Sequence, residues 1–156
     1  MAITMKSEYA IKIMLLIGLQ EKRVTAREIV NNCREKLPLE FTEKILADLT
    51  RHGLLKAYRG RSGGYELSKK LSEITIYDIV SSVDNPQETV RCFVKINEET
   101  STPETCAVNN IWETITKKIE ETLKSVTLEK LVNDYKAMCK QFESVKTPKK
   151  YTQKAR

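Results

Sequence analysis

The sequence predicts a mainly α-helical protein with a small β-hairpin wing: a winged helix-turn-helix followed by a long C-terminal dimerisation helix. Two helix-like segments with a short connection come directly before residues 58–67, which read YRGRSGGYEL. Two β-prone runs, Leu54–Tyr58 and Gly64–Leu67, flank the tip of this stretch, whose glycines allow the backbone to reverse. From Val108 onward, apolar residues recur at helical spacing and form a long stripe. These observations together define the predicted fold.

Length and composition favour one domain with an appended helical segment, in a chain of 156 residues of which 40% are hydrophobic. The longest apolar run, Ile11–Leu19, is interrupted by Lys12 and is shorter than the roughly 20 residues that span a bilayer. No signal-peptide pattern precedes this run, so we expect a cytoplasmic protein without a membrane segment. The cysteines lack the close pairing of a secreted disulfide framework; they are Cys33, Cys92, Cys106 and Cys139.

The net charge of +6 is unevenly distributed along the chain. Residues 1–70 carry 14 Lys and Arg against 8 Asp and Glu, whereas residues 71–143 carry 8 against 13. The basic part therefore coincides with the predicted helix-turn-helix and hairpin. Such an imbalance is typical of a surface that binds nucleic acid, although a solvated surface can also show it by chance.

The first two helices are predicted from apolar periodicity and from capping signals. Apolar residues at helical spacing predict a largely buried helix over Met5–Gln20, with Glu8 in its first turn, where a carboxylate complements the helix dipole. Thr25 and Glu28 have the spacing of a capping box, so the second helix is expected to begin there and to run to about Cys33.

The third helix is predicted over Leu39–His52, with Pro38 before it and Gly53 ending it. In a helix-turn-helix the second helix of the pair reaches base edges with its N-terminal residues. Those residues here are Glu40, Thr42, Glu43 and Lys44. A glutamate can accept a hydrogen bond from cytosine, but the two acids can equally serve only the helix dipole. His52 is most simply a cap.

The hairpin tip carries side chains suited to a phosphate backbone or a narrow groove. Arg59 and Arg61 provide guanidinium groups, and Ser62 adds a small hydroxyl between glycines. An ordinary surface hairpin is the alternative for the tip taken alone. The preceding helix pair and the basic charge of this half favour a role in DNA binding.

The remainder of the chain divides into segments with different patterns. A short helix is predicted over residues 75–83, which completes a DNA-binding domain over residues 1–83. A cysteine-bearing sensor loop is predicted over residues 84–107, since this stretch lacks clear periodicity. Residues 108–143 are expected to form two dimerisation helices, the second over Leu128–Phe142. Residues 144–156 contain five basic residues and no acid, and are expected to form a disordered tail.

Several of these stretches, taken in order, resemble the Rrf-type bacterial regulators, the family that includes IscR, NsrR and CymR. The resemblance covers residues 1 to about 142, and its motifs are Lys6–Ala10 (KSEYA), Arg59–Leu67 (RGRSGGYEL), Ile74–Val83, the pair Cys92 and Cys106, and Thr127–Val132 (TLEKLV). It implies a homodimeric winged-helix protein that binds a palindromic operator in double-stranded DNA and whose long helix crosses its twin.

The resemblance also implies a cofactor, because many members hold an iron–sulfur cluster on three cysteines of the sensor loop. This chain departs from that pattern: no cysteine lies between Cys92 and Cys106, where the middle region offers only Glu98 and Glu99, and Asn109 and Asn110 stand where some members carry a histidine. In another branch, an acid of the first helix and a histidine at the end of the second complete a [2Fe–2S] site with two loop cysteines of the other subunit.

This second pattern matches the chain better, because Glu8 occupies the acid position and Cys33 the histidine position. Thiolate is an established ligand for iron in such clusters. The resemblance thus implies a metal site made of Glu8 and Cys33 from one protomer with Cys92 and Cys106 from its partner. Two alternatives stay open: a regulator without a cluster whose thiols are packed or oxidised, and a site for another metal such as zinc.

The sequence favours a DNA-binding regulator that senses iron–sulfur or redox status, and two other classes of function compete with it. An interaction module that binds a metabolic enzyme partner is one alternative, since CymR-like members form such complexes. An enzyme is the least favoured class, because the chain has one histidine, in a cap position, and no nucleophile–base arrangement or phosphate-binding glycine loop.

Overall fold

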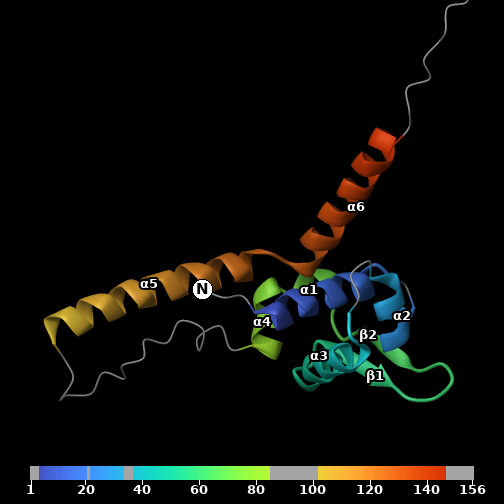
Figure 1. The fold of residues 1–156 in the computed structure, drawn as a ribbon, viewed down its shortest axis with the longest axis horizontal. Coiled ribbons are helices and arrows are strands. Elements are labelled where there is room, and N and C mark those ends of the chain that lie inside the picture. The colour runs from blue at the N-terminus through green and yellow to red at the C-terminus, as the bar shows by residue number, and fades with distance from the viewer. Residues whose placement is uncertain (1–3, 21, 34–36, 85–101, 147–156) are drawn as a thin grey trace, which may run out of the picture.

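The computed structural model of the protein describes residues 4–20, 22–33, 37–84 and 102–146. Its elements, in chain order, are α1 (Met5–Gly18), α2 (Ala26–Asn32), α3 (Leu39–Arg51), β1 (Leu55–Tyr58), β2 (Gly64–Leu67), a 3-10 turn η1 (Leu71–Glu73), α4 (Ile76–Val83), α5 (Pro103–Ser125) and α6 (Leu128–Lys146). Helices α1 to α4 and the hairpin gather into one body, from which α5 and α6 extend in different directions (Figure 1). The predicted fold class, mainly α-helical with a β-hairpin wing, is confirmed.

The core of this body forms around α1, which has five buried residues among its 14. Ala10, Ile13 and Met14 of α1 have no exposed surface and pack in one cluster with apolar residues of α3 and α4. Each fully buried aliphatic side chain contributes about 1.5–3 kcal/mol relative to an exposed one. The apolar face of α3, formed by Ile45, Leu46 and Leu49, is also fully buried, so α3 turns its other face outward.

The helix-turn-helix begins at a capping box, as the sequence predicts. The hydroxyl oxygen of Thr25 accepts a hydrogen bond from the backbone N–H of Glu28, and the Glu28 carboxylate accepts one from the N–H of Thr25. An N-cap of this type stabilises a helix by about 1 kcal/mol. At the other end of the motif, His52 is the C-cap of α3, and Gly53 follows with a φ of 74°, a left-handed conformation that favours glycine.

The wing is an antiparallel hairpin in which Leu55 pairs with Leu67 and Tyr58 with Gly64. A third segment joins it, because Val24 and Tyr65 exchange backbone hydrogen bonds of 3.0 and 2.9 Å. The chain just before α2 is thereby attached to the second strand of the wing. This attachment fixes the wing beside the helix-turn-helix.

The connection between α5 and α6 is fixed to the same body. Ile76 donates its backbone N–H to the carbonyl of Val126 at 2.8 Å, and Leu128 donates to the carbonyl of Ile74 at 2.8 Å. Leu128 itself is fully buried. The base of the long helix is therefore attached to the segment that leads from the wing into α4.

The described structure corrects two boundaries. Helix α5 begins at Pro103, so the predicted loop over residues 84–107 ends too late, and Cys106 lies in the first turn of a helix. The signals were Thr102, whose hydroxyl accepts from the N–H of Thr105, and a proline at the first helical position. Helix α6 continues to Lys146, beyond the predicted end at Phe142; residues 147–156 lie outside the described part of the chain.

Among the described residues, no helix combines the length and apolar character needed to cross a membrane.

Candidate nucleic-acid interface

A groove of about 730 Å³ lies between α2, α3 and the wing. Small side chains such as Ala26, Ala47 and Ala57 line it, together with residues 58–60 and 63–65 of the hairpin. Small lining residues leave room for a bulky ligand to approach the backbone. The groove runs along the outward face of α3, which is the face that a helix-turn-helix presents to DNA.

The charge of this groove is predominantly positive. Arg27 of α2, Arg51 of α3 and Arg59 of the wing all line it, against one acid, Glu43. Guanidinium groups form bidentate hydrogen bonds with phosphate and with guanine edges. The sequence pattern alone does not distinguish Arg27 and Arg51 as contacts, although both lie on helices of the motif. Arg51 follows Glu43 by eight positions, a spacing that returns to a similar face of α3.

The residues predicted at the N-terminus of α3 divide into two groups. Glu40, Glu43 and Lys44 are exposed, in accordance with a role as contacts, while Thr42 is only 1% exposed. The Thr42 hydroxyl donates a hydrogen bond to the carbonyl of Pro38 at 3.1 Å. Thr42 therefore packs inside the first turn, and its prediction as a base contact is wrong for this conformation. Spacing along the helix explains this, because Thr42 lies on the same side as Ile45 and Leu46.

At the tip of the wing, Arg59, Arg61 and Ser62 are all exposed. A second depression of about 410 Å³ lies between this tip and the start of α2, where Lys22, Arg61 and Ser62 line it. The predicted wing residues thus lie on the same side of the molecule as the groove. Their role as DNA contacts stays a prediction.

Three side chains fasten the base of the wing. The Arg23 guanidinium lies 3.4 Å from the centre of the Tyr58 ring and forms a 3.0 Å ion pair with Glu66. The Tyr58 hydroxyl donates to the other oxygen of Glu66 at 2.7 Å. Hydrogen bonds from Tyr58 and then Arg23 lower the pKa of Glu66, and the same Tyr58–Glu66 bond is the main cause that raises the pKa of Tyr58. Arg23 is therefore engaged in holding the hairpin.

The turn of the wing depends on its glycines. A Cβ atom at Gly63 would lie 2.6 Å from the carbonyl oxygen of Tyr58, too close for any side chain. Gly64 has a φ of 134°, and a Cβ atom there would meet the backbone of Val24 at 3.0 Å. These positions keep the two strands and the Val24 segment in close contact, so the tip is presented in a defined direction.

The predicted metal ligands lie at three separate places in one chain. Glu8 is in the first turn of α1 and pairs with Lys12 at 2.7 Å; Cys33 is the half-buried C-cap of α2 and packs against the core. Cys106 is half-buried in the first turn of α5, and Cys92 lies outside the described residues. Within the described part of a single chain, no three histidine, cysteine or acidic side chains gather in a way that could hold a metal ion.

Comparison with known proteins assigns the chain to a family. The family model Rrf2, described as "Iron-dependent Transcriptional regulator", matches residues 3–134. The HTH-type transcriptional regulator IscR of Pectobacterium atrosepticum is 31% identical over 136 residues, which cover 86% of this chain and 80% of that protein. IscR of Serratia proteamaculans is 32% identical over the same share of each chain.

Solved structures agree with this assignment. CymR, the global cysteine regulator of B. subtilis, superimposes with a TM-score of 0.68 at 27% identity, over 85% of this chain and 97% of that one. The T. potens IscR structure gives a TM-score of 0.66 at 26% identity, over 86% of this chain and 88% of that one. These relatives are named as transcriptional regulators and not as enzymes. The chain belongs to the Rrf2 family and is a DNA-binding transcriptional regulator of the winged helix-turn-helix type.

Proposed function

We propose that the protein acts as a homodimer on a palindromic operator and senses iron–sulfur or redox status through a [2Fe–2S] cluster that bridges the two subunits. Glu8 and Cys33 of one protomer, with Cys92 and Cys106 of its partner, are the proposed ligands. The observation that carries this proposal is the position of Cys106. It lies in the first turn of α5, the helix whose apolar stripe is exposed in the described part of one chain.

The dimer is supported by the exposure of α5. This helix of 23 residues contains no buried residue, and an apolar stripe along it is open to solvent: Val108, Ile111, Trp112 and Ile115 are 38–60% exposed. Leaving such a stripe in water is unfavourable by about 25 cal/mol for each Å² of apolar surface. A second copy of the same helix would cover the stripe, and a two-fold dimer presents two recognition helices to two half-sites.

The DNA contacts that we propose follow from the groove. We propose that Glu40, Glu43 and Lys44 of α3 contact base edges, whereas Arg59, Arg61 and Ser62 of the wing contact phosphates or the neighbouring minor groove; all six are exposed. Arg27 and Arg51 join this set because they line the groove itself. The excess of arginine over acid in the groove supports binding to a polyanion.

The chemistry of the proposed ligands fits iron. Three thiolates and one carboxylate supply four anionic ligands, and a cluster held by them would offer one-electron redox chemistry. Glu8 is paired with Lys12 and would have to exchange this partner for the metal, while Cys33 and Cys106 are half-buried and so partly accessible.

The proposed mechanism follows from where these residues are attached. Glu8 and Cys33 belong to the body that carries α3 and the wing, and Cys106 belongs to the helix that pairs the subunits. A link between the two sets would fix the separation of the two recognition helices. Loss of this link would allow the distance between the two recognition helices to change. The dimer would then fit less well to two half-sites spaced by one helical turn, about 34–36 Å.

Anaerobic purification and reconstitution with iron and sulfide test the cluster. We expect visible absorption and two irons per protomer, both lost in Cys92→Ala and Cys106→Ala, whereas Cys139→Ala on α6 serves as the matched control and retains them. Colourless, iron-free protein after reconstitution would rule out the cluster. Zinc bound at one equivalent would support the metal alternative.

A cluster-free regulator is the second candidate function. It would respond through oxidation of its thiols or through a metabolic enzyme partner, and the half-buried state of Cys33 and Cys106 is compatible with slow oxidation. DNA binding that changes reversibly with peroxide and thiol reductant in iron-free protein would favour it. A protein partner that displaces DNA from the iron-free regulator would favour the other form of this alternative.

A further inference from the structure

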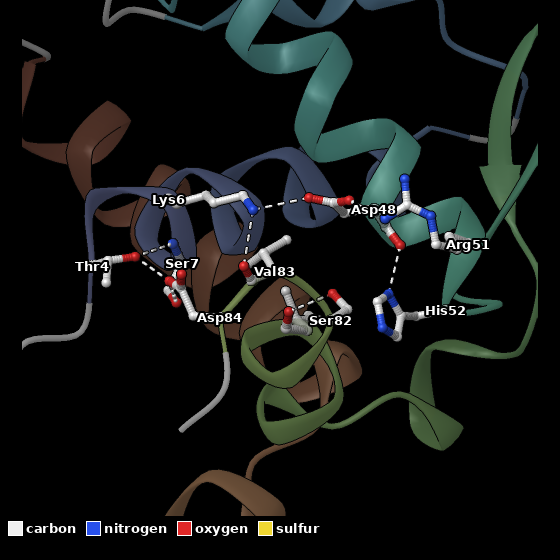
Figure 2. Close-up of polar contacts among 10 residues, drawn as sticks. Thr4, Lys6, Ser7, Asp48, Arg51, His52, Ser82, Val83 and Asp84 are labelled. Carbon is white, nitrogen blue, oxygen red and sulfur yellow. Dashed lines mark hydrogen bonds and ion pairs between the residues drawn. The ribbon is translucent and has the colours of Figure 1, made fainter. Parts of the chain in front are cut away.

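Lys6 connects three helices of the DNA-binding body at a single ammonium group. Its Nζ donates a hydrogen bond of 2.9 Å to the carbonyl oxygen of Val83, at the end of α4. The same Nζ forms a 2.9 Å ion pair with Oδ2 of Asp48 in α3 (Figure 2). One side chain of α1 thus holds both the recognition helix and the C-terminus of α4.

This ion pair differs from the helix-surface pairs, such as Lys130–Asp134, which join neighbours in one helix. The side chains of Lys6 and Asp48 are 30% and 19% exposed, against 60% and 51% for Lys130 and Asp134. Partial burial reduces solvent screening, and the hydrogen bond from Lys6 is the main cause that lowers the pKa of the Asp48 carboxyl. Asp48 therefore stays ionised at neutral pH and available to a second cation.

That second cation is Arg51, which lines the proposed DNA groove. Its Nη1 lies 2.9 Å from Oδ1 of Asp48, so the carboxylate binds Lys6 on one oxygen and Arg51 on the other. Figure 2 shows Asp48 between these two side chains. The Arg51 side chain is 70% exposed, and guanidinium has five N–H donors, so the bond to Asp48 leaves most of them for a ligand in the groove.

The end of α4 is held to α1 at a neighbouring point as well. Asp84, the C-cap of α4, accepts a 2.6 Å hydrogen bond from the hydroxyl of Ser7 and another from the hydroxyl of Thr4. Ser7 is only 1% exposed. These bonds hold the first turn of α1 against the end of α4. The backbone of Lys6 is therefore held in position independently of the ion pair with Asp48.

We propose that Lys6 is a positioning residue for DNA binding, which acts through Asp48 to hold the Arg51 guanidinium in the groove. The inference rests on the proposed contact of Arg51 with DNA. Apolar packing buries one face of α3, and the Lys6–Asp48 ion pair adds a polar contact to α1 beside that face. A charge-assisted hydrogen bond at one end specifies the rotation of α3 about its axis, and with it the direction of the groove-lining arginine.

Binding measurements on Lys6→Met test this inference. The probe is a duplex selected from a random-sequence pool by the wild-type dimer, and affinity is measured across a series of salt concentrations. We expect about tenfold weaker binding and a salt slope that falls by no more than it does in Arg51→Ala, because Lys6 acts through Arg51 and releases no counterion of its own from DNA. Arg51→Ala is expected to reduce the slope by about one. Lys6→Arg should retain near wild-type affinity, and Lys130→Met is the matched control.

A double-mutant comparison keeps the test decisive if Lys6→Met folds poorly. Asp48→Asn combined with Arg51→Ala should bind no more weakly than Arg51→Ala alone, since Asp48 acts through Arg51. Wild-type affinity in Lys6→Met, a salt slope in it that falls by more than in Arg51→Ala, or additive losses in the double variant would each overturn the inference. If Arg51→Ala alone changes neither affinity nor slope, the proposed contact fails instead, and if the wild-type dimer selects no duplex, the proposed operator binding fails.

Discussion

Asp48 shows how one side chain in this protein serves both stability and the binding surface. Its carboxylate accepts from Lys6 on the side of the core and from Arg51 on the side of the groove. Neither contact is evident from the sequence, where Asp48 is one acid on a helix. Thr42 shows the reverse: a polar residue at a typical contact position is buried against Pro38. Spacing along a helix predicts the face on which a residue lies only when the positions of the buried apolar residues are known.

The lowered pKa of Asp48 predicts a defined dependence of stability on pH. A carboxyl whose pKa falls on folding stabilises the folded state above its unfolded pKa, and this contribution disappears as pH falls through the folded pKa. Compared with wild type, Asp48→Asn should lose about 1 kcal/mol of unfolding free energy at pH 6. The difference should shrink below about pH 4. Urea titrations at a series of pH values measure it, and a difference that is constant down to pH 2 would contradict this assignment.

At the scale of elements, the hairpin shows which features a sequence specifies well. The strands lie where β-propensity and glycine predict them, and the pairing of Tyr58 with Gly64 follows from the positions of the turn residues. The attachment of the wing to Val24 and to Arg23 was not predicted, because both precede α2 and carry no strand pattern. Apolar periodicity alone predicts a start of α5 at Val108, later than Pro103, because the Thr102–Pro103 start signal precedes the apolar stripe.

The wing arginines provide a prediction about this element. Arg59→Ala and Arg61→Ala should each weaken DNA binding by about 1–3 kcal/mol, because each removes a guanidinium from an exposed tip beside the groove. Each is also expected to reduce the salt slope by about one. Fluorescence anisotropy with a labelled duplex at several salt concentrations measures both quantities. Lys136→Ala on α6 serves as a control of equal charge, and unchanged binding in both arginine variants would remove the tip from the interface.

At the scale of the whole molecule, the two extended helices, α5 and α6, carry apolar side chains that are exposed in a single chain. Helices α5 and α6 extend from the body in different directions (Figure 1). The apolar stripe of α5 is exposed, and so are Tyr135, Met138 and Phe142 of α6. The hydrogen bonds of Val126 and Leu128 attach the junction of these helices to the segment before α4. A force on α5 would therefore be transmitted to the body that carries the recognition helix.

Disruption of the α5 stripe tests the proposed dimer. Ile111→Asp places a charge in the centre of the exposed apolar face, and we expect the dimer to dissociate at micromolar concentration because the carboxylate would be desolvated on association. Sedimentation velocity measures the change in mass. Lys117→Asp on the opposite face of α5 is the matched control and should remain dimeric. A monomeric wild-type protein, or an Ile111→Asp variant that stays dimeric, would contradict the proposed interface.

The sequence by itself determined the order of elements, the capping boxes, the glycine turn of the wing and the family to which the chain belongs, because each of these depends on residues close together in the chain. Only the tertiary structure decided that Thr42 is internal, that Arg27 and Arg51 share a groove with Arg59, and that Lys6 meets Asp48. Such contacts join elements that are distant in sequence. Their geometry follows from how the apolar faces of α1, α3 and α4 pack together, which no local pattern encodes.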